Sequence, residues 1–483
     1  MNPNDDFDRP DKPEEACGVF GIYAPGEDVS KLTYFGLHAL QHRGQESAGI
    51  AVVDSNKSII IYKDMGLLTQ VFNERNLASL EGDIAIGHTR YSTTGSTHWE
   101  NAQPIYKTFK GGSLALAHNG NLINTQKLRA KLSQNGLRFR STSDSEVIAS
   151  MIASYAGKGK KIEDAIAKTM EQLLGAYSLV ILTEKKLFAV RDPHGVRPLA
   201  IGKLNGHYVV ASESCALNII GSDSFRDVKP GEIVVIDENG LTSIQAVKPK
   251  KSALCIFEFI YFARPDTRLY GRLLYSAREA MGAELAKEQP CEGADLVIGV
   301  PDSGVPSAIG YAQASGLPYR EGLVKNRYIG RTFIQPTQTI RQTGIKLKLN
   351  PLCEVIEGKK VVVVDDSIVR GNTSKKIIEI LKEAGAEEVH IRVSSPPVKW
   401  PCFYGIDTDD QKQLIAANKK VDEIREFIGA DSLGYLSIRG LVKATKNKRE
   451  NFCLACFDGK YPIEVPEDIR VAKLILEEEK ANS

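Results

Sequence analysis

The sequence predicts two folded units, of which the first is rich in β-strands and the second is an α/β unit with a parallel sheet. Short strand-like runs fill most of the chain from Cys17 to a basic, proline-bearing connection at 247–252. Beyond it, two continuous β-branched runs are each followed by a loop and a helical pattern, which is typical of parallel strands buried on both faces. A length of 483 residues is enough for two large domains or three smaller ones.

Composition excludes several classes of protein. An apolar fraction of 42% with 25% charged residues is ordinary for a globular chain and excludes disorder as the main state. The net charge of +2 gives no support to a nucleic-acid partner, because neutralising phosphates needs a basic surplus. No apolar run approaches the roughly 18 residues of a membrane span, so we expect no membrane role and a cytoplasmic location. The eight scattered cysteines argue against a disulfide framework.

The two ends of the chain differ from the rest. Residues 1–16 are acidic and proline-bearing and lack a hydrophobic centre, which predicts a disordered leader and excludes a secretory signal. Residues 471–483 form a polar tail. Between them, the boundary in the 247–252 connection predicts domains at 17–250 and 251–470.

Periodicity predicts the elements of each unit. In the first, helical patterns cover 32–45, 145–155 and 162–174, and strand-like runs lie at 17–25, 49–54, 58–64, 83–93, 113–122, 177–183, 186–192, 198–204 and 207–214. In the second, the strand patterns in 295–304 and 359–373 precede helices at 305–315 and 374–384, and the latter leads into a strand at 390–395. Ligands of such a parallel sheet bind at the carboxyl ends of its strands.

The segment Val361–Ser374 carries the richest motif. Four valines form a buried strand, and two carboxylates, Asp365 and Asp366, stand at its exit before a small polar loop that opens a helix. Loop N–H groups, hydroxyls and a helix N-terminus suit a phosphate dianion, whereas adjacent acids suit ribose hydroxyls or a hydrated Mg²⁺. A second strand exit, at 297–310, places Ser303 beside Gly304, which permits close approach of a ligand to the backbone.

This motif closely resembles the loop of type I phosphoribosyltransferases that binds 5-phosphoribosyl pyrophosphate (PRPP). The resemblance implies a PRPP site formed by Asp365, Asp366, Ser367, Ile368, Val369, Arg370, Gly371, Asn372, Thr373 and Lys325. It also implies Mg²⁺ on Ser303, Asp365 and Asp366. In that context, the cation-rich segment 325–349 is expected to be a lid that closes over the pyrophosphate leaving group and excludes water.

The first unit has a different signature. Cys17-Gly18 heads a strand, and HRGQES (42–47), GHTRYSTTG (87–95), HNGNL (118–122) and TSDSE (142–146) follow it. Together these motifs resemble the glutaminase domain of the N-terminal-nucleophile (Ntn) amidotransferases, which implies a four-layer αββα Ntn-hydrolase fold. By that resemblance, Cys17 attacks the glutamine amide, Asn119 and Gly120 supply oxyanion donors, Arg90 holds the substrate carboxylate and Asp144 holds its ammonium.

A terminal α-amine, with a pKa of about 7.7–8.0, can act as the base for such a thiol near neutral pH. Cys17 becomes terminal only if residues 1–16 are removed as a propeptide, as in some members of this class. The alternative is a Cys–His pair, for which His38, His42, His88 and His118 lie near the motifs. We expect these histidines to be packed or hydrogen-bonded instead.

Cys453 and Cys456 form a C-x₂-C pair, and Cys402 and Cys255 stand alone upstream. The residues themselves leave zinc, an iron–sulfur cluster or chance open, because four thiolates serve zinc and iron–sulfur clusters alike. The chain also resembles the propeptide-bearing members of the amidophosphoribosyltransferase family, which implies a [4Fe–4S] cluster on these four cysteines, structural rather than catalytic. Cys215, Cys291 and Cys353 are expected to be ordinary thiols.

The resemblance to this family covers the chain from Cys17 to about Pro462. It implies glutamine hydrolysis, passage of ammonia to C1 of PRPP with loss of pyrophosphate, and so the first committed step of purine synthesis. Implied partners are glutamine, PRPP, purine nucleotides as feedback inhibitors and further copies of the chain in a tetramer or dimer. Two alternatives remain: a glucosamine-phosphate-synthase-like amidotransferase, and a PRPP-sensing regulatory protein.

Overall fold

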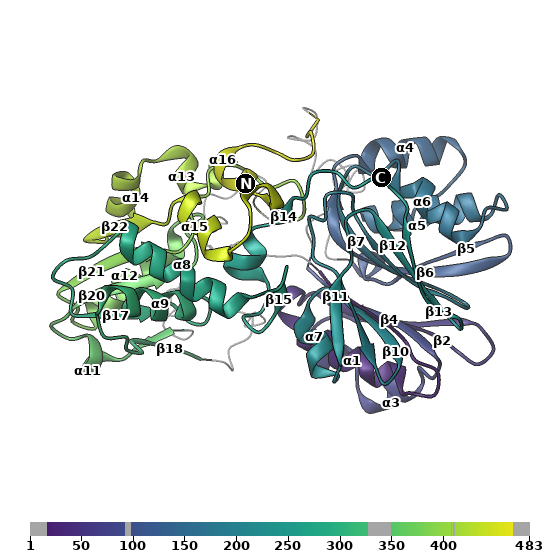
Figure 1. The fold of residues 1–483 in the computed structure, drawn as a ribbon, viewed down its shortest axis with the longest axis horizontal. Helices are drawn as coiled ribbons and strands as arrows, with labels where there is room; N and C mark the ends of the chain where they lie inside the picture. Colours follow the sequence, from purple (N-terminus) through teal and green to yellow (C-terminus); the bar gives the residue numbers. More distant parts are fainter. Residues whose placement is uncertain (1–16, 92–97, 327–348, 407, 409–410, 467–483) are drawn as a thin grey trace.

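The computed structural model describes residues 17–91, 98–326, 349–406, 408 and 411–466. The expected leader, the expected tail and all of the expected lid except its ends lie outside these residues. In Figure 1 the two halves lie side by side, with two stacked sheets in one and a smaller sheet flanked by helices in the other. No helix in the described part of the chain is long and apolar enough to cross a membrane.

The first half contains two antiparallel sheets packed face to face. One has the order β11 (Ser224–Asp227), β9 (Ala200–Leu204), β10 (His207–Ala211), β1 (Gly18–Tyr23), β4 (Ile84–Arg90), β2 (Ser47–Val53), β3 (Ile59–Met65). The other has the order β13 (Gly240–Gln245), β12 (Glu232–Asp237), β8 (Leu187–Arg191), β7 (Gly175–Thr183), β6 (Gly112–Leu122), β5 (Ile105–Phe109). Alternate side chains of each strand point into the core between the sheets. In this core, Val19 and Ile86 of the first sheet pack with Ala117 and Val180 of the second.

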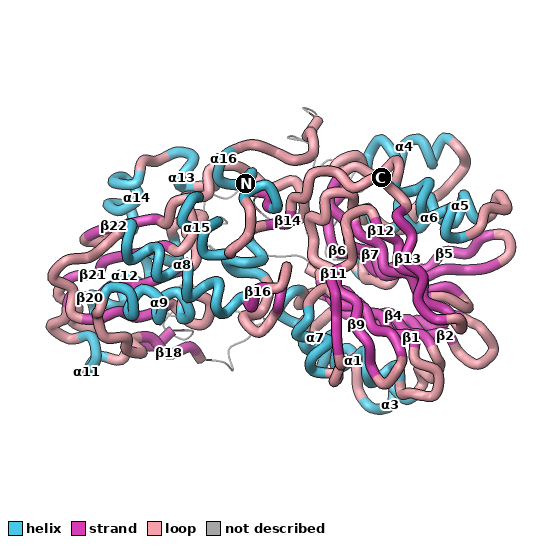
Figure 2. Tube along the Cα trace, viewed as in Figure 1, coloured by secondary structure: helices cyan, strands magenta, loops and turns pink. Residues whose placement is uncertain are grey.

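Helices cover both outer faces of this sandwich (Figure 2). The first sheet is covered by α1 (Val29–Ala39), α2 (Leu68–Val71), α3 (Glu74–Ala78) and α7 (Ser214–Ile219). The second is covered by α4 (Thr125–Gln134), α5 (Asp144–Ala156) and α6 (Ile162–Met170). The layer order is therefore helix, sheet, sheet, helix, and the predicted αββα fold is confirmed.

The second half contains a parallel sheet with the order β17 (Leu296–Gly299), β20 (Lys360–Asp365), β21 (Glu388–Val393), β22 (Ser432–Tyr435). One face packs on α8 (Leu274–Glu288), α9 (Val305–Ser315) and α15 (Ile438–Thr445). The other packs on α11 (Cys353–Ile356), α12 (Asn372–Glu383), α13 (Ile415–Asn418) and α14 (Val421–Ile428). The valines of β20 alternate between these two cores, which confirms a strand buried on both faces.

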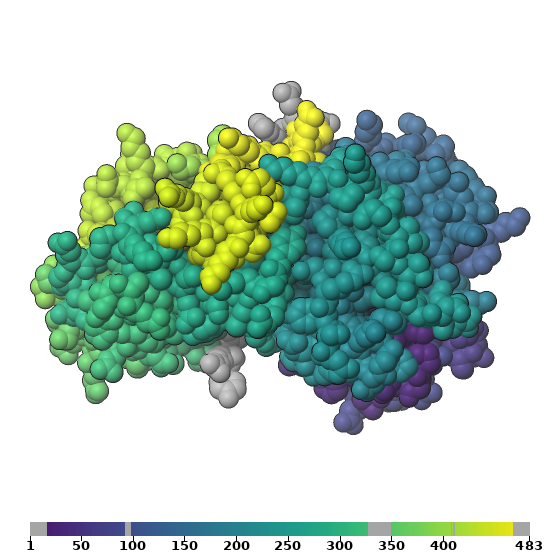
Figure 3. Space-filling model, viewed as in Figure 1, coloured from purple at the N-terminus to yellow at the C-terminus, as the bar shows by residue number. Residues whose placement is uncertain are grey.

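Short strand pairs complete the second half. A two-residue parallel pair links β14 (Leu254–Cys255) to β23 (Phe452–Cys453), and α16 (Ala455–Asp458) follows. Two further pairs are antiparallel: β15 (Arg268–Leu269) pairs with β16 (Arg272–Leu273), and β18 (Leu323–Lys325) pairs with β19 (Leu349–Pro351). On the face drawn in Figure 3, the C-terminal segment (yellow) packs over teal residues where the halves meet. One core cluster includes Ile123 and Val196 of the first half with Leu254 and Tyr404 of the second, so the halves share packing.

Some predicted elements differ from the observed ones. The helix predicted at 32–45 is α1, which ends at Ala39, followed by a 3₁₀ turn at Gln41–Arg43, because the backbone leaves helical geometry at Leu40 and becomes extended at Gly44. The elements that the sequence analysis missed in the first half are β5, β11, β12, β13, α2, α3, α4 and α7. In the second half they include the longer helices α8, α14 and α15, the sheet strand β22 and the short elements β14, β15, β16, β18, β19, β23, α11, α13 and α16.

Candidate active sites

Cys17 lies directly before β1, with only 8% of its surface exposed. In the register of β1 with β4, Gly18 pairs with Thr89, so Cys17 and Arg90 stand at the same end of the sheet. The Cys17 thiol donates to the carbonyl oxygen of Tyr91 across 3.6 Å. A Cβ on Gly18 would come within 2.7 Å of Thr89 Oγ1, so the residue after the thiol must be small for the strands to approach this closely.

Asn119 and Gly120 lie on β6, in the facing sheet. The Asn119 side chain is fully buried, and neither of its amide atoms has a hydrogen-bond partner within the described residues. Buried amides are normally hydrogen-bonded, so an amide without a partner is suited to a ligand. Gly120 has φ +146°, and a Cβ there would lie 2.1 Å from the carbonyl oxygen of Ala176, so only glycine fits.

Arg90 and Asp144 have the burial and charge expected of groups that hold an amino acid. Arg90 ends β4 and is 3% exposed, with its Nη1 3.8 Å from Glu46 Oε2. Asp144 begins α5, accepts from the Leu122 N–H across 3.0 Å and lies 3.4 Å from His118 Nδ1. Burial would raise the pKa of Asp144, but His118 and the hydrogen bonds outweigh it and lower the pKa. Its carboxylate therefore stays charged at the helix N-terminus.

The histidines near these motifs have other partners. His42 Nε2 lies 2.7 Å from Glu213 Oε1, and His88 Nε2 lies 3.1 Å from the carbonyl oxygen of His118. His118 Nδ1 lies 3.2 Å from Ser145 Oγ, and the ring of His38 packs against that of Tyr34. Burial lowers the pKa of His88 to about 3, so that imidazole is neutral. Each of these histidines is therefore packed or hydrogen-bonded through at least one ring contact.

The predicted phosphate loop follows β20, where the register pairs Val364 with Gly299 of β17. The exits of both strands therefore meet at one edge of the sheet. Ser303 Oγ, from the first exit, donates to Asp366 Oδ2. Asp365 and Asp366 are 4% and 1% exposed, and a Cβ on Gly304 would lie 2.4 Å from the carbonyl oxygen of Val364. The structure thus brings together the three residues expected to bind Mg²⁺, and carboxylate and hydroxyl oxygens are ligands that this ion prefers.

The rest of the loop turns sharply into α12. The Ser367 hydroxyl donates to Asp366 Oδ1 across 2.6 Å, and Ile368 and Val369 are buried in the cores on opposite faces of the sheet. Their packing anchors the loop. Gly371 has φ +87° and caps α12, in whose first turn lie Asn372 and Thr373. A helix N-terminus of this kind favours a phosphate group.

Charged side chains surround this loop. Arg370 Nε and Nη2 donate to Gln413 Oε1 across 3.1 and 2.9 Å. Lys325 Nζ lies 2.7 Å from Asp302 Oδ2 on the surface of the second exit. Arg278 is buried, and although the charge of Asp366 opposes the effect, burial lowers its pKa to about 10. Lys325 is therefore near the second exit, whereas the lid residues 327–348 lie outside the described part.

The four cysteines in question line one cavity. Cys255, Cys402, Cys453 and Cys456 line it together with Arg197 and the aromatic rings of Tyr404 and Tyr461. The register of β14 with β23 sets Cys255 opposite Cys453. Burial raises the pKa of the Cys453 thiol to about 12.

No group of three or more His, Cys, Asp or Glu side chains in the described segments is arranged to hold a single metal ion. Four thiolates on one zinc ion, each about 2.3 Å from it, would lie close together. The four cysteines nevertheless line one cavity.

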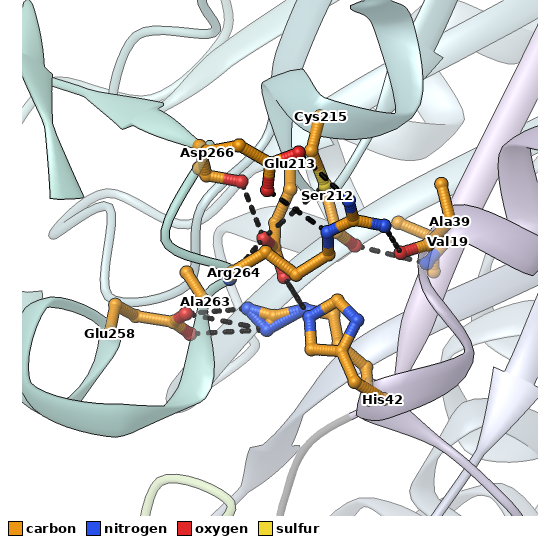
Figure 4. A network of polar contacts seen from close by, with 12 residues as sticks. Val19, Ala39, His42, Ser212, Glu213, Cys215, Glu258, Ala263, Arg264 and Asp266 are labelled. Atoms are coloured by element: carbon orange, nitrogen blue, oxygen red, sulfur yellow. Dashed lines mark hydrogen bonds and ion pairs between the residues drawn. The ribbon is translucent and has the colours of Figure 1, made fainter. Parts of the chain in front are cut away.

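A buried ionic network crosses the junction of the halves (Figure 4). Glu258 lies 2.6 Å from Arg43 Nη2 and 3.4 Å from Arg197 Nη1. Glu213 lies 3.0 Å from Arg43 Nε, accepts from the Thr267 hydroxyl across 2.6 Å and also binds His42. Sequence reasoning missed this network, because its carboxylates, Glu213 and Glu258, lie far in the chain from the HRGQES motif that provides His42 and Arg43.

Comparison with known proteins agrees with this two-site arrangement. Residues 88–218 match a glutamine amidotransferase domain, and residues 277–396 match a phosphoribosyl transferase domain. The amidophosphoribosyltransferase of Synechococcus elongatus is 55% identical over 475 residues, which are 98% of this chain and 96% of that protein. The chain belongs to the amidophosphoribosyltransferase family.

Solved structures agree with this membership. One, described as the allosteric regulatory enzyme of purine biosynthesis, has a TM-score of 0.90 and 47% identity, and the match covers 95% of this chain and 99% of that one. The glutamine PRPP amidotransferase of B. subtilis, solved with ADP and GMP, has a TM-score of 0.88 and 47% identity, with 94% and 98% covered.

Membership in the amidophosphoribosyltransferase family decides between the functions that the sequence left open. The chain is an enzyme with a glutaminase half and a phosphoribosyltransferase half, and glutamine and PRPP are the substrates of its family. The phosphoribosyl transferase match at 277–396 stands where a sugar isomerase would have to be. The full-length relatives likewise count against a regulatory protein without turnover.

Proposed function

We propose that this amidophosphoribosyltransferase uses Cys17 as an N-terminal nucleophile after removal of residues 1–16, and that it belongs to the propeptide-bearing iron–sulfur subgroup. The observation that carries the first part is the buried amide of Asn119, which has no partner among the described residues and lies on the strand that faces the Cys17 sheet. A donor kept without a partner in a protein core is suited to a charge that exists only during reaction.

The glutaminase steps follow from these groups. The α-amine of Cys17 accepts the thiol proton while sulfur attacks the amide carbon of glutamine, and the Asn119 amide and Gly120 N–H stabilise the oxyanion. The C–N bond then breaks, and the α-ammonium returns its proton to the leaving nitrogen, which departs as ammonia. Water hydrolyses the thioester to glutamate. Arg90 binds the α-carboxylate of glutamine and Asp144 binds its ammonium.

In the second half, the loop Asp365–Thr373 holds PRPP. Loop N–H groups and the N-terminus of α12 bind its 5-phosphate, and the carboxylates face the ribose hydroxyls and the pyrophosphate side. Ser303, Asp365 and Asp366 would hold Mg²⁺, which supplies positive charge against the departing pyrophosphate. Lys325, close to the second exit, adds a further cation, and ammonia attacks C1 as pyrophosphate leaves, giving 5-phosphoribosylamine.

The two reactions have to be coupled, because ammonia released into neutral water is protonated and loses its nucleophilic lone pair. We therefore expect PRPP binding to stimulate glutamine hydrolysis, with ammonia passing through the interior. Purine nucleotides, two of which are named with the B. subtilis structure, are expected to inhibit the enzyme, and the chain is expected to form a dimer or tetramer.

Cys255, Cys402, Cys453 and Cys456 would hold a [4Fe–4S] cluster, which supplies structural cross-linking and no electron to the reaction. The shared cavity of the four thiols supports this assignment. Iron and acid-labile sulfide should both fall in a Cys456→Ser variant and stay unchanged in Cys353→Ser, whose thiol is exposed and lies outside the cavity. Zinc without sulfide in the anaerobically purified protein would contradict it.

The first experiment is glutamate release from glutamine by anaerobically purified protein, with and without PRPP and Mg²⁺, alongside an intact mass. Loss of residues 1–16 together with strong stimulation by PRPP is expected. A full-length mass with full activity would overturn the N-terminal nucleophile, and equal glutaminase in both conditions would overturn the coupling.

A further inference from the structure

The strand that carries Asn119 and Gly120 is held from the opposite half of the chain. Asn121, the next residue on β6, donates through Nδ2 to the carbonyl oxygen of Phe403 across 2.9 Å, and the two residues are separated by 282 positions. Gly405 follows closely: a Cβ on it would lie 3.4 Å from the carbonyl carbon of Gly120 and 3.6 Å from Asn121 Cβ. The segment Phe403–Gly405 therefore packs directly on the peptide that follows Gly120.

Arg197, also from the glutaminase half, binds the segment Phe403–Gly405 as well. It is fully buried, and its Nη2 and Nε donate to the carbonyl oxygen of Tyr404 across 3.1 and 3.3 Å. Its Nη1 lies 3.4 Å from Glu258, a member of the ionic network at the junction. Two successive carbonyl groups of one segment, those of Phe403 and Tyr404, are thus bound by side chains of the glutaminase half.

The end of β6 needs such support. Gly120 has φ +146° and Gly175, on the neighbouring β7, has φ +135°, so both strands leave regular extended geometry here. Glycine has the greatest backbone conformational freedom of all residues, and glycine in the interior of a strand weakens that strand. Oxyanion donors, in contrast, work only when they are fixed about 2.7–3.1 Å from the developing charge.

We propose that Asn121 is a positioning residue for glutamine hydrolysis, which ties the oxyanion strand to the main chain of Phe403–Gly405 in the second half. This inference rests on the proposed oxyanion role of Asn119 and Gly120. Asn121 does not touch the reacting atoms. It acts through the neighbouring Gly120 peptide, so its loss affects the transition state more than the binding of glutamine.

The test is Asn121→Asp, which keeps the shape but replaces the donor with a carboxylate facing a carbonyl oxygen. The matched control is Asn124→Asp: Asn124 also donates to a main-chain carbonyl, that of Gln172, across 2.8 Å, but within the glutaminase half. We expect glutaminase kcat to fall about 10- to 100-fold in Asn121→Asp, with the KM for glutamine within about twofold, and little change in the control.

Two readouts separate positioning from general damage. Glutamate γ-semialdehyde adds to the Cys17 thiol to give a tetrahedral adduct, and its affinity should fall in parallel with kcat, whereas that of glutamate should not. Phosphoribosylamine formation from PRPP and added ammonia should stay within about twofold. An unchanged kcat, or a parallel loss of glutaminase and ammonia-dependent activity, would overturn the proposal.

A second variant tests the contact from the other side. Gly405→Ala places a Cβ 2.9 Å from Arg197 Nη2 at a residue with φ +108°, and should lower glutaminase kcat in the same way. A third variant, Asn119→Ala, distinguishes a failure of the oxyanion assignment from a failure of the positioning role of Asn121. If it leaves kcat unchanged, the oxyanion assignment itself is wrong; if it lowers kcat while Asn121→Asp and Gly405→Ala do not, only the positioning role is wrong.

Discussion

The two halves of the molecule build their sites in opposite ways. In the glutaminase half, the site residues come from separate elements: Cys17 before β1, Arg90 at the end of β4, Asn119 on β6 and Asp144 at the start of α5. In the phosphoribosyltransferase half, one loop of consecutive residues after β20 provides most of the groups. The first site depends on strand register across two sheets, whereas the second depends on one strand exit and one helix N-terminus.

This difference predicts that the two sites can be disabled separately. The largest expected effect is that of Cys17→Ala, which removes the proposed nucleophile and should lower glutamine-dependent synthesis at least about 10³-fold. Synthesis from PRPP and added ammonia should continue, because the second site is built from other elements. Cys353→Ala, at an exposed thiol, is the control. Equal loss with both nitrogen sources would contradict the separation.

Asp366→Asn probes the second site. It removes one of two buried carboxylates, to which Ser303 and Ser367 donate, and we expect about a 10²-fold loss of phosphoribosylamine formation with glutamine and ammonia alike. Glutaminase measured without PRPP should be nearly unchanged. A loss confined to the glutamine-dependent reaction would place Asp366 in the coupling and not in the PRPP site.

At the junction, where the two halves meet, a substitution should act on both. Glu258→Gln leaves Arg43 and Arg197 without its buried carboxylate and should destabilise the fold by about 3–5 kcal/mol. Chemical denaturation measures this loss. Glu426→Gln breaks an ion pair whose carboxylate is 70% exposed, and should cost no more than about 1 kcal/mol. Similar losses in the two variants would show that the junction network does not stabilise the fold.

The smallest effect is a dependence on pH in the glutaminase half. His88 stays neutral in the fold down to a pKa of about 3, whereas in the unfolded chain it binds a proton below about 6.5. The stability therefore falls as pH drops through this window, by about 1.4 kcal/mol per pH unit from this side chain. Denaturation of His88→Gln between pH 6.5 and 4 should show a shallower loss, with His207→Gln as the control. An unaltered slope would mean that His88 does not contribute.

The phosphoribosyltransferase site could be predicted from the sequence more fully than the glutaminase site. The loop after Val361–Val364 is contiguous, so its strand, its carboxylates and its helix could all be inferred from residue types. The cysteine of the first site could be placed at a strand head, but its partners could be assigned only by resemblance, since no local pattern links Cys17 to Asn119. The register of β1 with β4 places Cys17 and Arg90 at the same end of one sheet, whereas Asn119 lies on β6 in the facing sheet, so only the packing of the two sheets relates it to Cys17.

The missed elements have physical reasons. β5 and β13 lie at the ends of their sheet and carry many exposed side chains, so they lack the continuous apolar run of β7. The helix α8 buries Ala277 and Gly282, small residues that give little apolar periodicity. The network of Glu213 and Glu258 is formed only by tertiary packing, and no sequence spacing predicts it.

The pairing of Cys255 with Cys453 sets an order of events during synthesis. Ribosomes add about 5–20 residues per second, so the roughly 200 residues between these cysteines take about 10–40 seconds to appear. Until then β14 has no β23 to pair with, and the cavity lacks two of its four thiols. The last strand of the phosphoribosyltransferase sheet ends at Tyr435, so this sheet is complete before Cys453 and Cys456 are made. A chain that stops between Tyr435 and Cys453 can therefore contain both sheets of the glutaminase half and this sheet, yet it lacks two of the four thiols that line the cavity.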